Sequence, residues 1–282
     1  MRYVLTTDPD EFAARTEGFL AAHIECNVLA TVLLRVLDGG HRDPPPRFVY
    51  GLTSGEEVGF AALRTAPWPL LSSPLGDANA RELMERWLKV DPDVSAVTGV
   101  PGAARELAAA WAQHTGGTTR TRMREAMHVL EEVRDPPLPA PGSLRLARGD
   151  ERDLLIAWME EFVREADVAG ATQAASWVDG SLRRDGLLIW EDGEPVSMLG
   201  VNPQVAGVVR IGPVYTPPAQ RRRGYAGSAV AAASRRALAA GAQRCMLFTD
   251  VTNPTSNKIY AEVGYRRTGD WEEIELTRGE SA

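Results

Sequence analysis

Residues 220–227 read QRRRGYAG and stand between a strand-like run, VVRIGPVYT at 208–216, and an alanine-rich run with helical spacing at 228–241. A strand that leads through a glycine-bearing turn into a helix exposes backbone N–H groups at the positive end of the helix dipole. Gly224 lets the backbone approach a ligand closely, Ala226 keeps the first helical turn small, and the arginines add charged donors. The segment therefore predicts a phosphate-binding turn.

The residues around this turn predict a series of strands and helices. Asn253 is placed to cap a helix that begins at Pro254 and ends at Gly264. Alternation and turn signals predict the remaining elements of this half. They are a strand at 143–147, a helix at 150–166 capped by Asp150, a hairpin at 186–201 around Asp192 and Gly193, a strand at 243–251 and a last strand at 271–276.

The first half repeats this order weakly. It predicts a hairpin around Ser54 and Gly55, followed by helices and strands in the same succession. The predicted segments are strands at 48–52 and 56–64, a helix at 80–89, a strand at 94–100, a helix at 104–116 and a strand at 124–133. We interpret this half as a related fold that lacks the arginine turn.

The chain has 282 residues, which exceeds one average domain and favours two. The proline-dense segment DPPLPAPG at 135–142 is typical of a stiff linker between patterned regions. We therefore predict a first domain at 1–134, a linker at 135–141 and a second domain at 142–282.

Composition narrows the class of partner. The formal net charge is −7, which argues against a general affinity for nucleic acid. No window approaches the roughly 18 consecutive apolar residues that a membrane span needs, and the first residues, MRYVLTTDPDEF, lack the pattern of a secretory signal. Cys26 and Cys245 are the only cysteines, lie in apolar stretches and are expected to be buried thiols. We expect a cytoplasmic protein without membrane contact that acts on a small molecule.

The order and spacing of these segments resemble the GCN5-related N-acetyltransferase (GNAT) family. Its signature runs Gln or Arg, two residues, Gly, one residue, then Gly or Ala, and Arg221, Gly224 and Ala226 fill it. The resemblance extends over residues 143–276. It implies a mixed α/β (α+β) fold of two GNAT-like domains, each a mostly antiparallel mixed sheet flanked by helices, with a splayed strand at the acyl-CoA site of the second.

The resemblance also implies the binding of acetyl-CoA, with its pyrophosphate on the backbone of the turn. The implied contacts of the turn are Arg221, Arg222, Arg223, Gly224, Tyr225, Ala226, Gly227 and Ser228. In the family the preceding strand bulges and splays so that its free backbone groups pair with the pantetheine, which assigns that role to Val214 and Tyr215. The pair Gly212-Pro213 is consistent with such a disrupted strand.

The helix that begins at Pro254 supplies a second site. Asn253, Asn257 and Tyr260 are four and three residues apart and so share one face. The resemblance implies that Asn253 and Asn257 contact the cofactor and that Tyr260 is the general acid that protonates the departing CoA thiolate. A phenol with pKa about 10 and a thiol with pKa about 8.5 are close enough for such a proton transfer.

Other ionisable residues carry weaker assignments. Glu160, Glu161, Glu165 and Asp250 are all candidates for the general base, and none stands out from a solvated carboxylate. The four histidines show no metal-ligand spacing, so we assign them no function and expect no metal. They are His23, His41, His114 and His128. Trp68, Trp87 and Trp111 are expected in the core, ahead of pocket lining.

The sequence thus predicts an N-acetyltransferase that moves an acyl group, with acetyl favoured over longer groups, from CoA to a primary amine of a small molecule. A non-catalytic acyl-CoA-binding or regulatory module is the alternative, and nucleic-acid binding through Arg221 to Arg223 is a third hypothesis. Residues 67–88 take the place of the turn in the first half. They offer Gly76 but no family signature, and Asp77 and Glu82 would repel a pyrophosphate. We expect this first domain to pack against the second half, to shape the acceptor pocket or to support an oligomer interface, for example that of a homodimer.

Overall fold

The computed structural model describes residues 1–40, 43–166 and 174–279. The chain forms two compact units, Met1–Glu125 with Gly269–Ala282, and Ala126–Thr268. His41, which we predicted to have no function, lies outside the described residues. Among the residues that the structure describes, no helix has the length and apolar character needed to cross a membrane.

The first unit is a mixed sheet with helices. Its elements are β1 (Arg2–Thr6), α1 (Pro9–Ala22), α2 (Asn27–Leu37), β2 (Arg47–Leu52), β3 (Val58–Arg64), β4 (Leu70–Ser72), α3 (Ala80–Val90), β5 (Ala96–Gly99), α4 (Pro101–Thr115), the start of β6 (Thr118–Leu130) and most of β12 (Arg266–Thr277). The strand order begins β1-β2-β3-β4-β5-β12. β4 and β5 are parallel, whereas the other pairs of known register are antiparallel.

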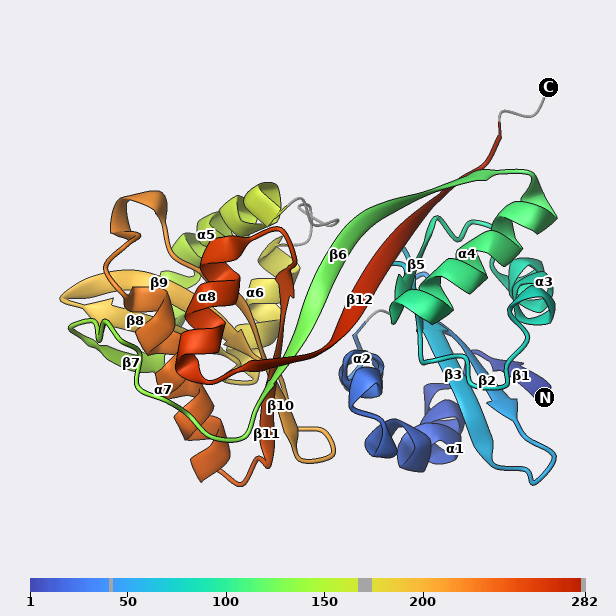
Figure 1. Cartoon of the computed structure of the whole chain (residues 1–282), viewed down its shortest axis with the longest axis horizontal. Coiled ribbons are helices and arrows are strands. Elements are labelled where there is room, and N and C mark those ends of the chain that lie inside the picture. Colours follow the sequence, from blue (N-terminus) through green and yellow to red (C-terminus); the bar gives the residue numbers. More distant parts are fainter. Residues whose placement is uncertain (41–42, 167–173, 280–282) are drawn as a thin grey trace. The chain divides into compact units, whose positions relative to one another are not determined.

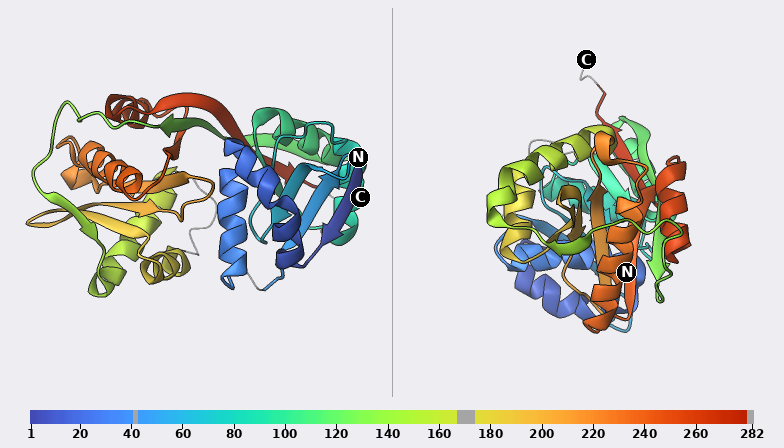
Figure 2. Two further views of the ribbon diagram at one scale, coloured as in Figure 1. Left: turned by 90° about the horizontal axis from the view of Figure 1, so that it is seen from below. Right: turned by 90° about the vertical axis from the view of Figure 1, so that its left-hand side faces the viewer.

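The second unit repeats this plan (Figure 1). Its elements are the end of β6, then β7 (Ser143–Leu146), α5 (Arg152–Ala166), α6 (Ala174–Arg183), β8 (Leu187–Asp192), β9 (Glu194–Val201), β10 (Val208–Tyr215), α7 (Tyr225–Ala239), β11 (Arg244–Asp250), α8 (Pro254–Val263) and the start of β12. The strand order is β6-β11-β10-β9-β8-β7, with β10 and β11 parallel. Figure 2 shows helices on both faces of this sheet, α7 and α8 on one and α5 and α6 on the other.

Each unit therefore runs strand, two helices, three strands, helix, strand, helix, and each places its fourth and fifth strands parallel, whereas its other pairs of known register are antiparallel. The predicted class of fold is confirmed. Local signals also agree at α8, where the Asn253 side chain accepts a hydrogen bond from the N–H of Ser256 at 3.0 Å and Pro254 is the first helical residue. Asp150 does not cap α5 as predicted, because it lies inside a short 3-10 turn that precedes the helix.

The strand that completes each sheet differs from the prediction. The segment 124–133 was expected to close the first domain, but Ala126 onward belongs to the second unit, and Gly269 onward returns to the first. β12 pairs antiparallel with β5, joining Glu272–Glu275 to Ala96–Gly99. Alternation along a strand predicts which face is buried but not which sheet the strand joins.

The predicted linker is also placed differently, because residues 135–141 lie within the second unit. The segment is held there by hydrogen bonds: the Ala140 N–H donates to the Ser228 hydroxyl at 2.9 Å, and the Trp190 indole N–H donates to the Pro141 carbonyl at 2.8 Å. It is a packed segment of the unit that carries the arginine turn.

The cores agree with the sequence. Trp87 and Trp111 are fully buried in the first unit, as predicted, whereas Trp68 is half-buried. The thiols of Cys26 and Cys245 are both buried and free. Burial raises the pKa of Cys26 to about 12 and that of Cys245 to about 11.

β12 contributes Ile274 and Leu276 to the apolar core of the first unit. We expect Ile274→Ala to lower the free energy of unfolding of that unit by about 2–4 kcal/mol, because it leaves a cavity in a packed core. The neighbouring Glu275→Ala, at a side chain that is 41% exposed, should change it by less than about 0.5 kcal/mol. Hydrogen exchange of peptides from residues 1–125 measures the effect, and unchanged protection in Ile274→Ala would contradict the assignment of β12 to this core.

Candidate functional site

The predicted phosphate turn connects β10 to α7 in the second unit (Figure 1). The chain passes through a short 3-10 turn, Pro218–Gln220, and reaches the N-cap of α7 at Gly224, which has a φ of +81°. Arg222 has a φ of +65°, a left-handed conformation that is uncommon outside glycine. Such strained positions cluster at functional sites.

The backbone N–H groups in the first turn of α7 form no hydrogen bonds within the helix. The Ser228 N–H bonds the Gly224 carbonyl at 3.0 Å, so the N–H groups of the three preceding helical residues have no acceptor within the helix. Gly224 brings no side chain that could accept from them. At α3, by contrast, the Asn79 side chain accepts from the Glu82 N–H at 3.0 Å. The start of α7 is therefore suited to receive an anion from outside the chain.

The three arginines of the turn have different surroundings. Arg221 forms an ion pair with Glu165 of α5, with its closest contact at 2.6 Å, and donates to the Thr216 carbonyl at 2.8 Å. Arg223 donates to the Gln220 side chain at 3.0 Å. Arg222 is exposed, and no hydrogen bond or ion pair joins it to the described residues. Among the described residues, therefore, neither Arg222 nor Arg223 is neutralised by a carboxylate, and Arg222 is the less engaged of the two.

Tyr225 and Ser228 have their side chains engaged within the protein. The buried Tyr225 ring directs its hydroxyl to Asp192, to which it donates at 2.6 Å. The pKa of Tyr225 is raised, chiefly by this hydrogen bond to a carboxylate. The Ser228 hydroxyl accepts the N–H of Ala140. These two residues can therefore contact a ligand at the turn mainly through their backbone groups.

β10 and β11 separate next to this turn. Their pairing joins Val208–Arg210 to Arg244–Met246 and ends there, although β10 continues to Tyr215 and β11 to Asp250. The facing edges of both strands beyond these pairs lack a ladder partner. The predicted splay is present.

The other edge of β10 shows why the strand bends. Its register against β9 shifts between Ile211 and Val214, and the residues between them form a bulge. Gly212 there has a φ of +141°, which favours glycine, and Pro213 has no N–H to give to a ladder. After the bulge, Val214 and Tyr215 pair again with β9, and their opposite edge is open. This geometry matches the prediction that Gly212-Pro213 disrupts the strand.

The Tyr215 side chain points to the α5 face of the sheet. It is buried in a cluster with Trp158 of α5, and its hydroxyl donates to Glu161 at 2.6 Å. Burial and this hydrogen bond raise the pKa of Tyr215 well above its ordinary value. The Arg221 guanidinium lies 5.7 Å from its ring centroid. These contacts fix the end of β10 to α5 and to the turn.

α8 packs against both α7 and β11, and its N-terminus follows directly on the open half of β11. The Asn257 amide donates to the carbonyls of Asp250 and Asn253 at 3.0 and 2.7 Å. The Asn253 side chain is used as the helix cap. Hydrogen bonds therefore hold Asn253 and Asn257 at the start of α8, the helix that also carries Tyr260.

Tyr260 differs from the other polar residues of α8. It is half-buried against the same apolar cluster as Val214, and its ring meets that of Tyr265 edge-on at 6.1 Å. Among the described residues none accepts a hydrogen bond from its hydroxyl. Burial raises the pKa of Tyr260 to about 12, so the phenol is protonated at neutral pH.

The predicted base candidates are largely occupied. Glu161 accepts from Tyr215 and Glu165 is paired with Arg221. One Asp250 carboxylate oxygen accepts from both the N–H and the hydroxyl of Thr252, each at 2.7 Å. Glu160 is exposed on α5.

The corresponding place in the first unit lacks both features of the site. β4 has 3 residues and β5 has 4, against 8 in β10 and 7 in β11, so the parallel pair ends without opening. A Cβ on Gly99 would lie 2.9 Å from the Ser72 carbonyl oxygen, which shows how closely the two strands approach at their ends. In addition, the Asn79 side chain caps α3, whereas no side chain caps α7.

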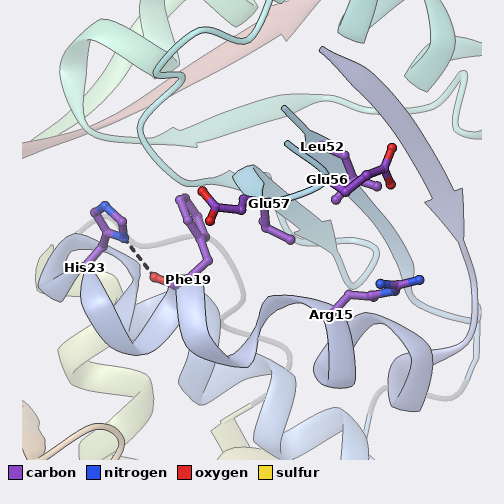
Figure 3. A pocket seen from close by; sticks show the side chains of 7 residues that line it. Arg15, Phe19, His23, Leu52, Glu56 and Glu57 are labelled. Atoms are coloured by element: carbon purple, nitrogen blue, oxygen red, sulfur yellow. Dashed lines mark hydrogen bonds between the residues drawn. The ribbon is translucent and has the colours of Figure 1, made fainter. Parts of the chain in front are cut away.

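The first unit contains a separate hollow of about 410 Å³ between α1 and the β2–β3 turn. Figure 3 shows its lining, where His23 is hydrogen bonded through Nδ1 to the Phe19 carbonyl at 2.8 Å. The residues around it are Arg15, Phe19, His23, Leu52, Glu56, Glu57 and Val58. None of them belongs to the turn, the splayed strands or α8.

The comparisons with known proteins agree with this geometry. Residues 151–265 match the family model described as acetyltransferase (GNAT) family. A GNAT-family acetyltransferase from Colwellia psychrerythraea is similar over 99% of this chain and 100% of its own, with 11% identity and a TM-score of 0.59. A GCN5-related N-acetyltransferase from Sphaerobacter thermophilus is similar over 98% of this chain and 96% of its own, with 15% identity and a TM-score of 0.60.

A tandem GNAT protein from the clavulanic acid biosynthesis pathway is similar over 100% of this chain and 99% of its own, with 13% identity and a TM-score of 0.58. No curated protein sequence is significantly similar to the chain. Residues 151–265 therefore carry a GNAT-family domain, and the fold of the whole chain is similar to that of this tandem GNAT structure. The resemblance predicted from Arg221, Gly224 and Ala226 is confirmed at the level of the family.

Proposed function

We propose that the second unit binds acetyl-CoA and transfers its acetyl group to a primary amine of a small molecule. The observation that carries this proposal is the opening between β10 and β11 beside a helix whose first donors are unused. A pyrophosphate at the start of α7 would accept from backbone N–H groups and meet the Arg222 side chain. The pantetheine would extend along the open edges of the two strands.

The assigned contacts follow from these positions. The backbone of residues 222–228 would hold the pyrophosphate, and the open edge of Val214 and Tyr215 would pair with the pantetheine amides. Asn253 and Asn257, at the start of α8, would border the same channel. Arg221 is assigned to the turn for its backbone, because its side chain is paired with Glu165 and so positions the turn.

In the proposed reaction the amine nitrogen attacks the thioester carbonyl carbon, the new C–N bond forms, and the C–S bond breaks with its electron pair on sulfur. The proton lost by nitrogen goes to a base, for which Glu160, Glu161, Glu165 and Asp250 stay candidates. Holding amine and thioester together supplies much of the acceleration. A strand N–H near Tyr215 would donate to the tetrahedral oxyanion.

Tyr260 is assigned as the acid that protonates the leaving thiolate. Its pKa of about 12 lies above that of an exposed thiol. Burial raises thiol pKa values as well, and the buried Cys26 and Cys245 have pKa values of about 12 and 11. The more the bound thiolate is shielded from water, the closer its pKa would come to that of this phenol.

Replacing Gly224 by alanine should weaken acetyl-CoA binding about tenfold or more, because a Cβ there collides with the Leu138 carbonyl and the turn must shift. Gly241→Ala is the matched control: Gly241 also has a positive φ, +99°, but a Cβ would meet nothing within 4 Å. Titration calorimetry on both folded variants measures the effect. Equal affinity in Gly224→Ala and the parent would place the cofactor elsewhere.

Tyr260→Phe should keep the affinity for acetyl-CoA and lower turnover about 100-fold, because the hydroxyl acts only as the thiolate forms. The rate is measured with a competent amine under conditions where chemistry limits turnover. Tyr50→Phe, in the first unit, is the control and should turn over normally. A normal rate in Tyr260→Phe would remove the acid from the mechanism, and cofactor binding with no transfer to any amine would favour the non-catalytic alternative.

The first unit is proposed to bind no CoA, because its short β4 and β5 do not open and Asn79 caps α3. Titration of the full chain with CoA should give one site per chain. The affinity of that site should fall in Gly224→Ala by the factor given above. Two comparable sites, or one that is indifferent to this substitution, would show that the first unit binds CoA after all.

A further inference from the structure

The proline-rich segment at residues 135–141, here called the strap, crosses the start of α7. Asp135 forms an ion pair with Arg235 of α7, the Ala140 N–H bonds Ser228, and the Pro141 carbonyl accepts from Trp190. Prolines at alternate positions stiffen the backbone between these anchors. The strap is therefore a fixed part of the second unit.

The strap touches both glycines of the turn. A Cβ on residue 224 would collide with the Leu138 carbonyl oxygen and would lie 3.5 Å from the Leu138 Cγ. A Cβ on Gly227 would lie 3.7 Å from the Pro136 Cβ. Among the described residues, no hydrogen bond joins the Leu138 carbonyl to the N–H groups of residues 225–227, so the strap stands beside those donors without using them.

The Leu138 side chain is directed to solvent at this point. It is 60% exposed, the highest value among the large exposed hydrophobic residues, of which Leu37, Val90 and Leu154 are 37–40% exposed. The unpaired Arg222 belongs to the turn that Leu138 contacts. An apolar side chain is thus held rigidly at the edge of a site for phosphate.

We propose that the strap is a wall of the acyl-CoA site at its nucleotide end and that Leu138 packs against the adenosine moiety of CoA. This inference rests on the proposed function. A pyrophosphate bound at the start of α7 brings the adenosine within a few bonds of the turn, and a purine presents flat apolar faces. Covering Leu138 with such a face removes apolar surface of both partners from water.

Leu138→Ala should weaken acetyl-CoA binding about fivefold to tenfold, the loss expected when part of a leucine side chain no longer packs against the ligand. The affinity for acetyl-4′-phosphopantetheine, which lacks the adenosine with its 3′-phosphate and one phosphate of the pyrophosphate, should be the same in Leu138→Ala as in the parent. Leu154→Ala, at an exposed leucine of α5, is the matched control and should bind both ligands like the parent. Titration calorimetry with each ligand measures these affinities, and thermal unfolding confirms that each variant is folded.

The outcomes separate this inference from the proposed function. If the parent binds acetyl-CoA and Leu138→Ala binds it equally well, Leu138 does not contact the ligand. Equal weakening for both ligands would also overturn the adenosine contact, because the strap would then act on the turn alone. A parent protein that binds neither ligand would overturn the proposed function and this inference with it.

Discussion

The parallel pairing of β10 with β11 is short, and the candidate site depends on where it stops. Three residue pairs join the strands, and the bulge around Gly212 and Pro213 then turns β10 away. Each strand leaves backbone donors and acceptors on the side facing the other. Unpaired backbone groups favour a hydrogen-bonding partner, and we propose that the pantetheine amides supply it here. The contacts of Tyr215 with Glu161 and of Arg221 with Glu165 hold the end of β10 in this position.

The two units show that the fold alone does not make the site. Both have the same order of elements and both place a parallel pair of strands at the same point in the sheet. In the first unit, shorter strands remove the opening, and the Asn79 side chain takes over part of the role of an external anion at the start of α3. The two units therefore differ at this point in the length of the parallel strands and in one N-cap side chain. These differences leave the second unit, and not the first, with an opening suited to a ligand.

Local chemistry could be predicted from the sequence, whereas long-range placement could not. The turn at Gly224, the bulge at Gly212-Pro213 and the cap at Asn253 each follow from the residues themselves. The ion pair between Arg221 and Glu165 joins residues far apart in the chain, and no local sequence pattern predicts it. The density of prolines at 135–141 predicted an extended segment between two domains, whereas the segment lies within the second unit. Proline density could not distinguish a linker from a strap, because both are extended and lack regular backbone hydrogen bonds.

The return of Gly269 onward to the first unit orders events during synthesis. On a ribosome, an amino-terminal domain commonly folds while the rest of the chain is still being made. Here Ile274 and Leu276, part of the first core, emerge only after the whole of residues 126–268. Until then β5 presents an unpaired edge, the kind of surface that invites pairing with another chain. The first unit can therefore complete its sheet only after the second has been translated. During that interval its unpaired edge is a surface to which a chaperone could bind.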